Sequence, residues 1–271
     1  MAGKKTQRAS RYASARREIE SLRTEVGRLR QEKREIDQQN TLHHLVMAAE
    51  YRDHDTGAHL VRIGYLCALV APACGWNADL TRMLMMAGPM HDVGKIGIPD
   101  RILKKDGWLS EKERVVMMRH PEYGARILSG SSAPVLRLAS EIALTHHECF
   151  DGSGYPRGLK GEGIPLQARI VAVVDVFDAL AMNRSYRQAM PVEHALSLIE
   201  GERGSHFDPG VVDAFFSVIG PILALRDRIS RGERPDHIPG ITGTPHGDPL
   251  GFYDFPLDWT PEMSGDDLAN Q

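Results

Sequence analysis

Between residues 42 and 230 the apolar residues recur at steps of three and four, which is the spacing of α-helices that bury one face. Eight segments follow this pattern, at residues 45–54, 59–75, 78–94, 111–130, 133–148, 168–182, 191–202 and 209–229. Ser110 precedes one segment as a helix cap, and Gly75 and Gly130 follow two others as stops. The pattern therefore predicts an all-α domain over residues 42–230.

One stretch interrupts the helical pattern, the glycine-rich sequence FDGSGYPRGLKGEGIPL at residues 150–166. Its glycines allow the backbone to turn tightly, and Pro156 stiffens it. We expect this stretch to form a long loop within the helical domain.

The N-terminal pattern is different, because charged residues dominate from residue 15 to residue 41 and apolar positions are sparse. The apolar positions are Ile19, Leu22, Val26, Leu29 and Ile36, with Lys33 at the missing position. A stripe this narrow is the a/d seam of a left-handed coiled coil, and it predicts a parallel homodimer paired through residues 15–41. The alternative is a single solvated helix that lies on the domain.

The two ends of the chain lack this periodicity. Residues 1–14 are basic and predict a flexible N-terminus, without the apolar segment of a secretory signal. Residues 231–271 are dense in proline, glycine and aspartate, which predicts a mostly disordered tail.

Composition narrows the classes of function. The net charge of −3 over 271 residues gives no case for binding a nucleic acid polymer. The longest apolar runs are far too short to span a bilayer, so we expect no membrane insertion. The three cysteines, Cys67, Cys74 and Cys149, show no paired spacing, which indicates a reduced, cytoplasmic protein.

Histidines and aspartates supply the candidate chemistry. The set comprises His59, His91, Asp92, His120, His146, His147, Asp175 and Asp178. Asp175 and Asp178 lie in the apolar run IVAVVDVFDAL, where an ionised carboxylate is costly unless it is paired or binds a metal. Imidazole and carboxylate ligands without cysteine suit iron, manganese, nickel or zinc in a catalytic site.

The adjacent pair His91 and Asp92 makes physical sense in such a site. A carboxylate has two oxygens and can bridge two ions about 3.5–4 Å apart, so Asp92 can hold two ions together while His91 binds one of them. Lys95 follows about one turn later and can offer a positive charge to a phosphate oxygen. The combination indicates phosphoester hydrolysis, with Asp92 and Lys95 as the catalytic residues.

Six longer stretches resemble the HD-GYP family of HD metal-dependent phosphohydrolases. They are DTGAHLVRIG from Asp55, HDVGKIGIPDRIL from His91, MMRHPEYGARIL from Met117, THHECFDGSGYPRGLKGEGIPLQARI from Thr145, DVFDALAMNRSYRQAM from Asp175 and HFDPGVVDAF from His206. The resemblance implies an all-α, HD-type domain that hydrolyses the bacterial second messenger cyclic di-GMP. It also implies a site of two or three divalent metal ions, with iron or manganese expected and nickel or zinc as alternatives.

The same resemblance implies a set of metal ligands. They are His59, His91, Asp92, His120, His146, His147 and Asp175, and Asp92 would bridge two ions. One ion would take His59, His91 and Asp175, and the other would take the remaining histidines. Asp55 stands where many members have glutamate, which is one methylene longer. This change puts a third metal ion in doubt, and with it hydrolysis beyond the linear product pGpG to GMP.

The resemblance also implies substrate-binding residues. Lys95 would contact the scissile phosphate and protonate the leaving oxygen. Arg184 and Arg187, in NRSYR, match basic positions that hold the phosphates of the substrate. Tyr155 of the GYP motif would stack on a base or pack the loop.

Two alternatives to a cyclic di-GMP phosphodiesterase stay open. One is an HD phosphohydrolase of another cyclic nucleotide or dinucleotide, and the other is a weakly active module that binds cyclic di-GMP and signals by contact. The chain keeps every ligand of the pattern apart from the change at Asp55, which favours the enzyme. We expect its input to come from an upstream sensor or regulator protein through the N-terminal helix, or from a domain outside this chain.

Overall fold

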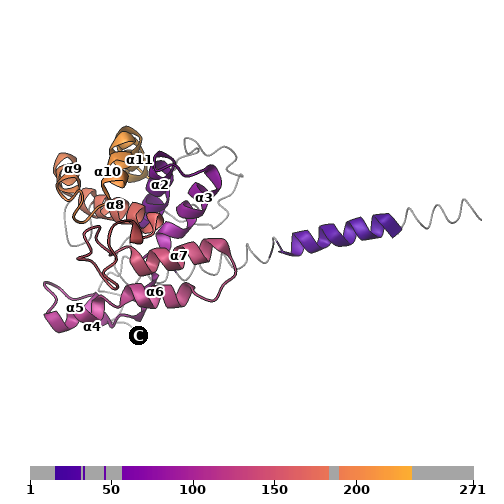
Figure 1. Cartoon of the computed structure of the whole chain (residues 1–271), viewed down its shortest axis with the longest axis horizontal. Coiled ribbons are helices and arrows are strands. Elements are labelled where there is room, and N and C mark those ends of the chain that lie inside the picture. The colour runs from indigo at the N-terminus through magenta and orange to yellow at the C-terminus, as the bar shows by residue number, and fades with distance from the viewer. Residues whose placement is uncertain (1–15, 32, 34–45, 47–56, 183–188, 234–271) are drawn as a thin grey trace, which may run out of the picture. The chain divides into compact units, whose positions relative to one another are not determined.

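The computed structural model describes residues 16–31, 33, 46, 57–182 and 189–233 (Figure 1). The chain divides into two compact units, Met1–Leu42 and His43–Gln271. In the first unit, residues 16–31 form a helix whose side chains are all exposed. The predicted pairing of this helix, and the bounds of the four predicted segments, stay predictions. Ile36 and nearly all of the two predicted flexible ends lie outside the described residues.

The described part of the second unit is helical and contains no β-strand, which confirms the all-α prediction. Its α-helices are α2 (Gly57–Ala73), α3 (Ala78–Ala87), α4 (Asp100–Leu103), α5 (Glu111–Met117), α6 (His120–Leu128), α7 (Pro134–Thr145), α8 (Leu166–Ala181), α9 (Val192–Gly201), α10 (Pro209–Ser217) and α11 (Ile219–Ser230). Three short 3-10 turns are η1 (Gly88–Met90), η2 (Val93–Gly97) and η3 (Gly161–Gly163).

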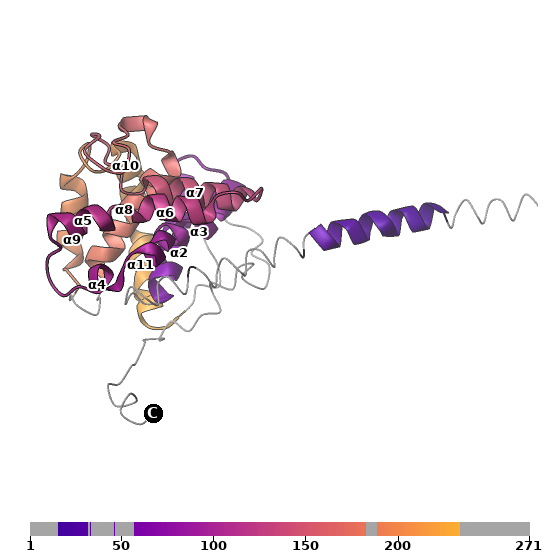
Figure 2. The ribbon, with the colours of Figure 1, turned by 90° about the horizontal axis from the view of Figure 1, so that it is seen from below.

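Helices α2 and α8 form the centre of the second unit. Both are apolar on almost every side, and they pack against each other and against α10 (Figure 2). Phe177 of α8 and Phe215 of α10 are fully buried, with ring centroids 5.2 Å apart. A polar residue in either central helix is therefore buried as well, and it needs a partner inside the protein.

A second layer consists of α6 and α7, which lie side by side, with η2 packed closely on α6 (Figure 1). Gly94 makes this approach possible. A Cβ atom at Gly94 would overlap the backbone carbonyl oxygen of His120 and the backbone nitrogen of Gly124. Because only glycine fits there, the turn that follows Asp92 lies directly against the start of α6.

Three predicted helices are broken in the structure. The segment 78–94 ends as an α-helix at Ala87 and continues as the turns η1 and η2, while 111–130 divides into α5 and α6 and 209–229 divides into α10 and α11. Each break lies shortly before a proline, namely Pro89, Pro121 and Pro221. Proline lacks an amide hydrogen and clashes with the preceding turn, so it begins a helix more readily than it continues one. His120 consequently begins α6, whereas the predicted helix over residues 111–130 placed it near the middle.

Among the described residues no single helix is long and apolar enough to cross a membrane. Helices α10 and α11 pass that test only as a pair, by length and composition, and they are bent by 67°.

Candidate metal centre

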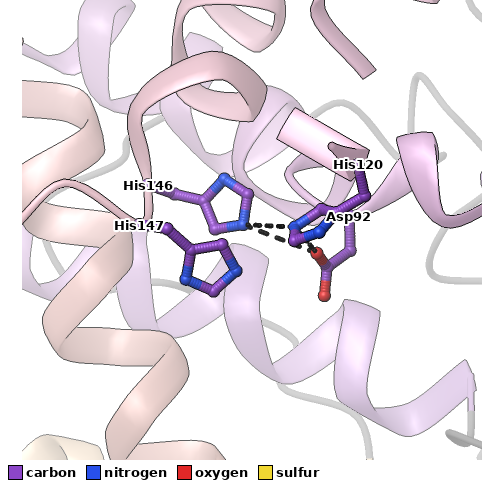
Figure 3. Close-up of side chains that lie close together, drawn as sticks. All are labelled: Asp92, His120, His146 and His147. Carbon is purple, nitrogen blue, oxygen red and sulfur yellow. Dashed lines mark hydrogen bonds and ion pairs between the residues drawn. The ribbon is translucent and has the colours of Figure 1, made fainter. Parts of the chain in front are cut away.

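Seven of the predicted ligand residues meet in two groups. The first group is His59, His91 and Asp175, and the second is Asp92, His120, His146 and His147. Within each group, one nitrogen or oxygen atom per residue lies within 4.8 Å of those of the others. Figure 3 shows the second group, in which the rings of His120 and His146 lie next to the Asp92 carboxylate and the ring of His147 lies beside that of His146. We refer to these sets as the first and second ligand groups.

The Asp92 carboxylate lies between the two groups. Its Oδ2 atom is 3.3 Å from Nε2 of His91 in the first group. Its Oδ1 atom is 3.1 Å from Nε2 of His120 and 3.4 Å from Nε2 of His146 in the second group (Figure 3). Across the first group, Nε2 of His59 and Nε2 of His91 each lie 3.8 Å from Oδ1 of Asp175. One carboxylate thus faces both ligand groups, one oxygen to each.

Helix ends supply most of these residues. His91 follows η1 directly, Asp92 precedes η2, and His120 is the first residue of α6. His146 caps the C-terminus of α7. The breaks before Pro89 and Pro121 therefore place ligand residues at turns, where side chains from different elements can converge on one point.

Backbone carbonyl groups fix the tautomer of three histidines. Nδ1 of His91 donates to the carbonyl oxygen of Gly88 at 2.9 Å, and Nδ1 of His120 donates to that of Met117 at 2.9 Å. Nδ1 of His146 lies 3.0 Å from the carbonyl oxygen of Ala143. A carbonyl oxygen can only accept, so each Nδ1 carries the hydrogen and each neutral ring has its lone pair on Nε2. These Nε2 atoms point at Asp92 and Asp175.

His59 is oriented by side chains instead. Its Nδ1 atom lies 2.7 Å from Oδ2 of Asp178, which belongs to α8. Asp178 also accepts from Arg62 of α2, with Nε at 2.5 Å and Nη2 at 2.9 Å. All three side chains are buried. Burial opposes ionisation of Asp178, but Arg62 and His59 outweigh it and hold the pKa of this carboxyl well below its usual range.

The residues of both groups fit divalent metal ions. Nε2 of His91 and Oδ1 of Asp92 are buried and have no hydrogen-bond partner within the described part of the chain. With the hydrogen of His120 on Nδ1, its Nε2 cannot donate to Oδ1 of Asp92, so two acceptors face each other and call for a cation between them. Burial lowers the pKa of His91, yet Asp92 and Asp175 outweigh burial and raise it to about 9. A buried nitrogen and oxygen donor set without sulfur is typical of a catalytic transition-metal site.

The glycine-rich loop lies against the second group. The ring of Tyr155 stacks on that of His147, with centroids 4.8 Å apart and planes 21° apart. The carboxylate of Glu148 is buried and accepts from the backbone nitrogens of Arg157 at 2.8 Å and Leu159 at 2.9 Å. Glu148 directly follows the two adjacent histidines, so these hydrogen bonds tie the loop to the second ligand group.

Lys95 contacts the shared carboxylate. Its Nζ atom lies 2.8 Å from Oδ2 of Asp92, and the side chain is only partly buried. Burial opposes ionisation of Asp92, but Lys95 and His91 outweigh it and hold the pKa of Asp92 well below its usual range. The site therefore contains a carboxylate that stays ionised beside a cation that can reach a bound anion.

The sequence profile of the HD domain matches residues 26–211, which is more than half of the chain. This chain belongs to the HD domain family. The family name and the two ligand groups together support a site for divalent metal ions.

Individual relatives of this HD-domain chain are phosphodiesterases. Over 177 residues it is 50% identical to the cyclic di-GMP phosphodiesterase response regulator RpfG of Xanthomonas campestris, covering 65% of this chain and 47% of that protein. It is 48% identical over 174 residues to a cyclic di-GMP phosphodiesterase of Thermotoga maritima, with coverages of 64% and 47%. The chain therefore spans about half the length of these relatives.

Another relative has a different substrate in its name. The 3'3'-cGAMP-specific phosphodiesterase 2 of Vibrio cholerae is 40% identical over 185 residues, covering 68% of this chain and 35% of that protein. A crystal structure of a cyclic GMP-AMP phosphodiesterase of the same organism matches with a TM-score of 0.48 at 20% identity. That match covers 67% of this chain and 50% of the other.

Some site residues lie beyond the described structure, and others were missed by sequence reasoning. Asp55, Arg184 and Arg187 lie outside the described residues of this HD domain. The roles of Arg62 and Glu148 were not predicted. Arg62 had a usable signal, because it is a lone charge in the apolar run of α2 and a buried charge needs a partner. Glu148 had none, since an acid before a loop is usually solvated.

Proposed function

We propose that this chain is a metal-dependent phosphodiesterase that hydrolyses cyclic di-GMP. The observation that carries the proposal is the pair of ligand groups that face one shared carboxylate, Asp92, with Lys95 beside it. The relatives named cyclic di-GMP phosphodiesterases, at 50% and 48% identity over the domain, support the choice of substrate.

The seven residues of the two ligand groups would hold two divalent ions, iron or manganese, with nickel and zinc also compatible with the donor set. Bound ions of this kind supply a nucleophile at neutral pH and neutralise charge that develops on phosphoryl oxygens. Asp92 would be the ligand common to both ions. The Nδ1 hydrogen bonds of the histidines keep each Nε2 lone pair directed into the site.

Lys95 has two tasks in the proposed reaction. Its ammonium group, held at Asp92, offers a positive charge to an oxygen of the scissile phosphate. As water adds to phosphorus and the bond to the leaving ribose oxygen breaks, the same group can give that oxygen a proton. Arg184 and Arg187 are proposed to hold the phosphates, and Tyr155 to pack the loop against His147.

Base specificity and the extent of hydrolysis are the open choices. The relative that is specific for 3'3'-cGAMP, at 40% identity, makes a mixed cyclic dinucleotide the second candidate substrate. Asp55 is one methylene shorter than glutamate, so we propose two ions and linear pGpG as the main early product, without a firmly held third ion.

The test compares purified chains loaded with iron(II) or manganese(II) on cyclic di-GMP and on 3'3'-cGAMP, with the products resolved by chromatography. We expect faster turnover of cyclic di-GMP and accumulation of pGpG. Asp92→Ala should lose activity and much of its metal, because both ions lose a ligand. Asp79→Ala, which removes an exposed carboxylate of α3, is the matched control. Full activity in Asp92→Ala, or no turnover of either dinucleotide by the loaded wild-type chain, would refute the proposal.

The remaining partners are also proposals. A second copy of the chain would pair through the N-terminal helix, and an upstream sensor or regulator would act on that helix. The reduced, cytoplasmic location is likewise a proposal, based on the spacing of the three cysteines.

A further inference from the structure

Helix α5 carries an exposed arginine, Arg114, whose side chain makes no hydrogen bond or ion pair with any residue that the structure describes. An acid is available at a suitable spacing, because Glu111 stands three residues earlier on the same helix. Elsewhere in the chain this spacing produces an ion pair, as between Arg82 and Asp79 of α3 at 3.1 Å. The guanidinium of Arg114 is therefore a cation without a counter-ion in the described part of the chain.

The acid next to Arg114 already has partners on another side of the helix. Glu113 accepts from Nζ of Lys105 at 2.5 Å, and from the hydroxyl group of Ser110 at 2.7 Å. Its bond to the Ser110 backbone completes a capping box that fixes the start of α5. Consecutive side chains on an α-helix point about 100° apart, so Arg114 faces away from these contacts. A substitution at Arg114 therefore leaves the capping of α5 intact.

The other end of α5 reaches the second ligand group. The carbonyl oxygen of Met117, the last residue of α5, accepts from Nδ1 of His120 at 2.9 Å. Arg114 stands three residues before Met117, and one turn of an α-helix rises only about 5.4 Å. The helix thus places Arg114 within one turn of the carbonyl group that orients a proposed metal ligand.

The charge of Arg114 also acts on the glycine-rich loop. Burial and the Asp92 carboxylate raise the pKa of the Tyr155 hydroxyl above its usual range, and the positive charges of Lys95 and Arg114 oppose that shift. The ring of Tyr155 stacks on that of His147, with centroids 4.8 Å apart. Two cations from different elements therefore lie near the second ligand group. Lys95 contacts the shared carboxylate, whereas Arg114 contacts no carboxylate among the described residues.

A cation in this position suits a phosphate that takes no part in the reaction. A cyclic dinucleotide has two phosphodiester groups, and the proposed metal ions and Lys95 act on the one that is cleaved. The guanidinium group is a planar fork that matches two oxygens of a phosphate, and it is less strongly hydrated than an ammonium group. Because Arg114 has no internal counter-ion, binding an anion breaks no existing ion pair.

We infer that Arg114 binds the second, non-scissile phosphate of a cyclic dinucleotide held at the metal centre. The inference rests on the proposed function for the class of substrate, and it adds a contact from α5, a helix to which the proposed reaction gives no role. Cyclic di-GMP and 3'3'-cGAMP carry the same phosphates. The contact should therefore contribute to affinity for both dinucleotides and not to the choice between them.

Binding to full-length, metal-loaded chains tests this contact. The probes are bisphosphorothioate analogues of cyclic di-GMP and 3'3'-cGAMP, which resist hydrolysis, and GMP, which has a single phosphate. Arg114→Ala should weaken binding of both analogues at least about tenfold and by the same factor, since a charge-assisted contact is lost, and should weaken GMP far less. Arg114→Lys should be intermediate, because it keeps the charge and loses the fork.

The matched control is Arg126→Ala, which removes an exposed arginine from the last turn of α6 that likewise has no ion pair among the described residues. It should bind both analogues like the wild type. Alanine favours the helix, so Arg114→Ala should fold, and helix content and bound metal check this.

Equal weakening of the two analogues by Arg114→Ala, with metal content intact, supports the inference. Wild-type affinity in Arg114→Ala, a loss confined to one analogue, an equal loss for GMP, or a wild-type chain that binds neither analogue would each overturn it. Failure of the proposed function is a separate result. A wild-type chain that binds the analogues but hydrolyses neither dinucleotide would refute that function, while the affinity of Arg114→Ala would still decide the inference.

Discussion

The two ligand groups differ in what holds their histidines. At His120 and His146 of the second group, and at His91 of the first, Nδ1 bonds to a backbone carbonyl oxygen three or four residues earlier in the chain. His59 is held instead by Asp178, which is 119 residues away and is itself held by Arg62. Backbone carbonyls cannot be removed by substitution, whereas a carboxylate can. The first group therefore depends on the side chain of Asp178, which contacts no proposed metal ion. The second group has no such dependence at His120 and His146.

The groups also differ in their surroundings. The first lies where the central helices α2 and α8 meet, inside the core. The second is covered by the glycine-rich loop, through the stacking of Tyr155 on His147 and the hydrogen bonds of Glu148. Changes in the core should thus act on the first group, and changes in the loop on the second.

The largest effect is expected from Asp178→Ala. It leaves the Arg62 guanidinium buried without its partner, which costs about 3–5 kcal/mol of unfolding free energy. It also frees the ring of His59, and loss of such an orienting partner lowers metal affinity about 10–100-fold. Metal titration should show that one ion binds more weakly and that the affinity for the other is nearly unchanged. The midpoint of urea unfolding should also be lower.

Asp178→Asn provides a second variant of the same volume, in case the alanine chain fails to fold. The matched control is Asp213→Ala, which breaks another aspartate–arginine pair, with Arg203, at the surface. Exposed pairs contribute about 0.2–1 kcal/mol, so the control should stay close to wild type. If the affinities for both ions fell equally, or if neither affinity fell, the distinction between the two groups would be wrong.

An intermediate effect is expected where the two groups join. Gly94 follows Asp92 closely, and the methyl group of Gly94→Ala would overlap the backbone at His120 and Gly124. Pushing η2 away from α6 should cost about 1–3 kcal/mol and separate the shared carboxylate from the histidines of the second group. Urea unfolding and metal titration measure the two consequences.

The control for this change is Gly220→Ala in α11, where a new Cβ meets no atom within 4 Å. Alanine in a helix should there be neutral or stabilising by up to about 1 kcal/mol. If Gly94→Ala were as stable as Gly220→Ala and bound metal equally well, the close packing of η2 on α6 would not be what joins the groups.

These contrasts show how far the sequence could be interpreted. The spacing of apolar residues predicted the all-α fold. It also predicted two continuous helices, at residues 78–94 and 111–130, that are interrupted in the structure before Pro89 and before Pro121. Apolar periodicity records which side chains are buried. It does not record whether the backbone hydrogen bonds continue, so proline should have been weighted more heavily than periodicity at those positions.

The ligand residues and their supports were not equally predictable. His91, Asp92 and the adjacent histidines stand in short, distinctive sequences, and the structure brings all seven proposed ligands together. Arg62 and Asp178 each stand out as a charge in an apolar helix, but their contact depends on how α2 packs on α8. A single sequence contains no direct information on a contact across 116 residues.

The smallest effect on the metal site is expected from Glu148→Gln, which concerns the loop side of the second group. Both carboxylate oxygens now accept from backbone nitrogens, those of Arg157 and Leu159. The glutamine amide can accept at only one of these places and presents a donor to the other, so one buried backbone N–H loses its partner at a cost of about 1–3 kcal/mol. Hydrogen exchange should show faster exchange at the amides of Arg157 and Leu159, while metal content stays at the wild-type level and the KM for the dinucleotide rises. Glu162→Gln, an exposed acid of the same loop, should change neither exchange nor KM. Unchanged protection of both amides in Glu148→Gln would show that the Tyr155 stack, and not the carboxylate, holds the loop on the second group.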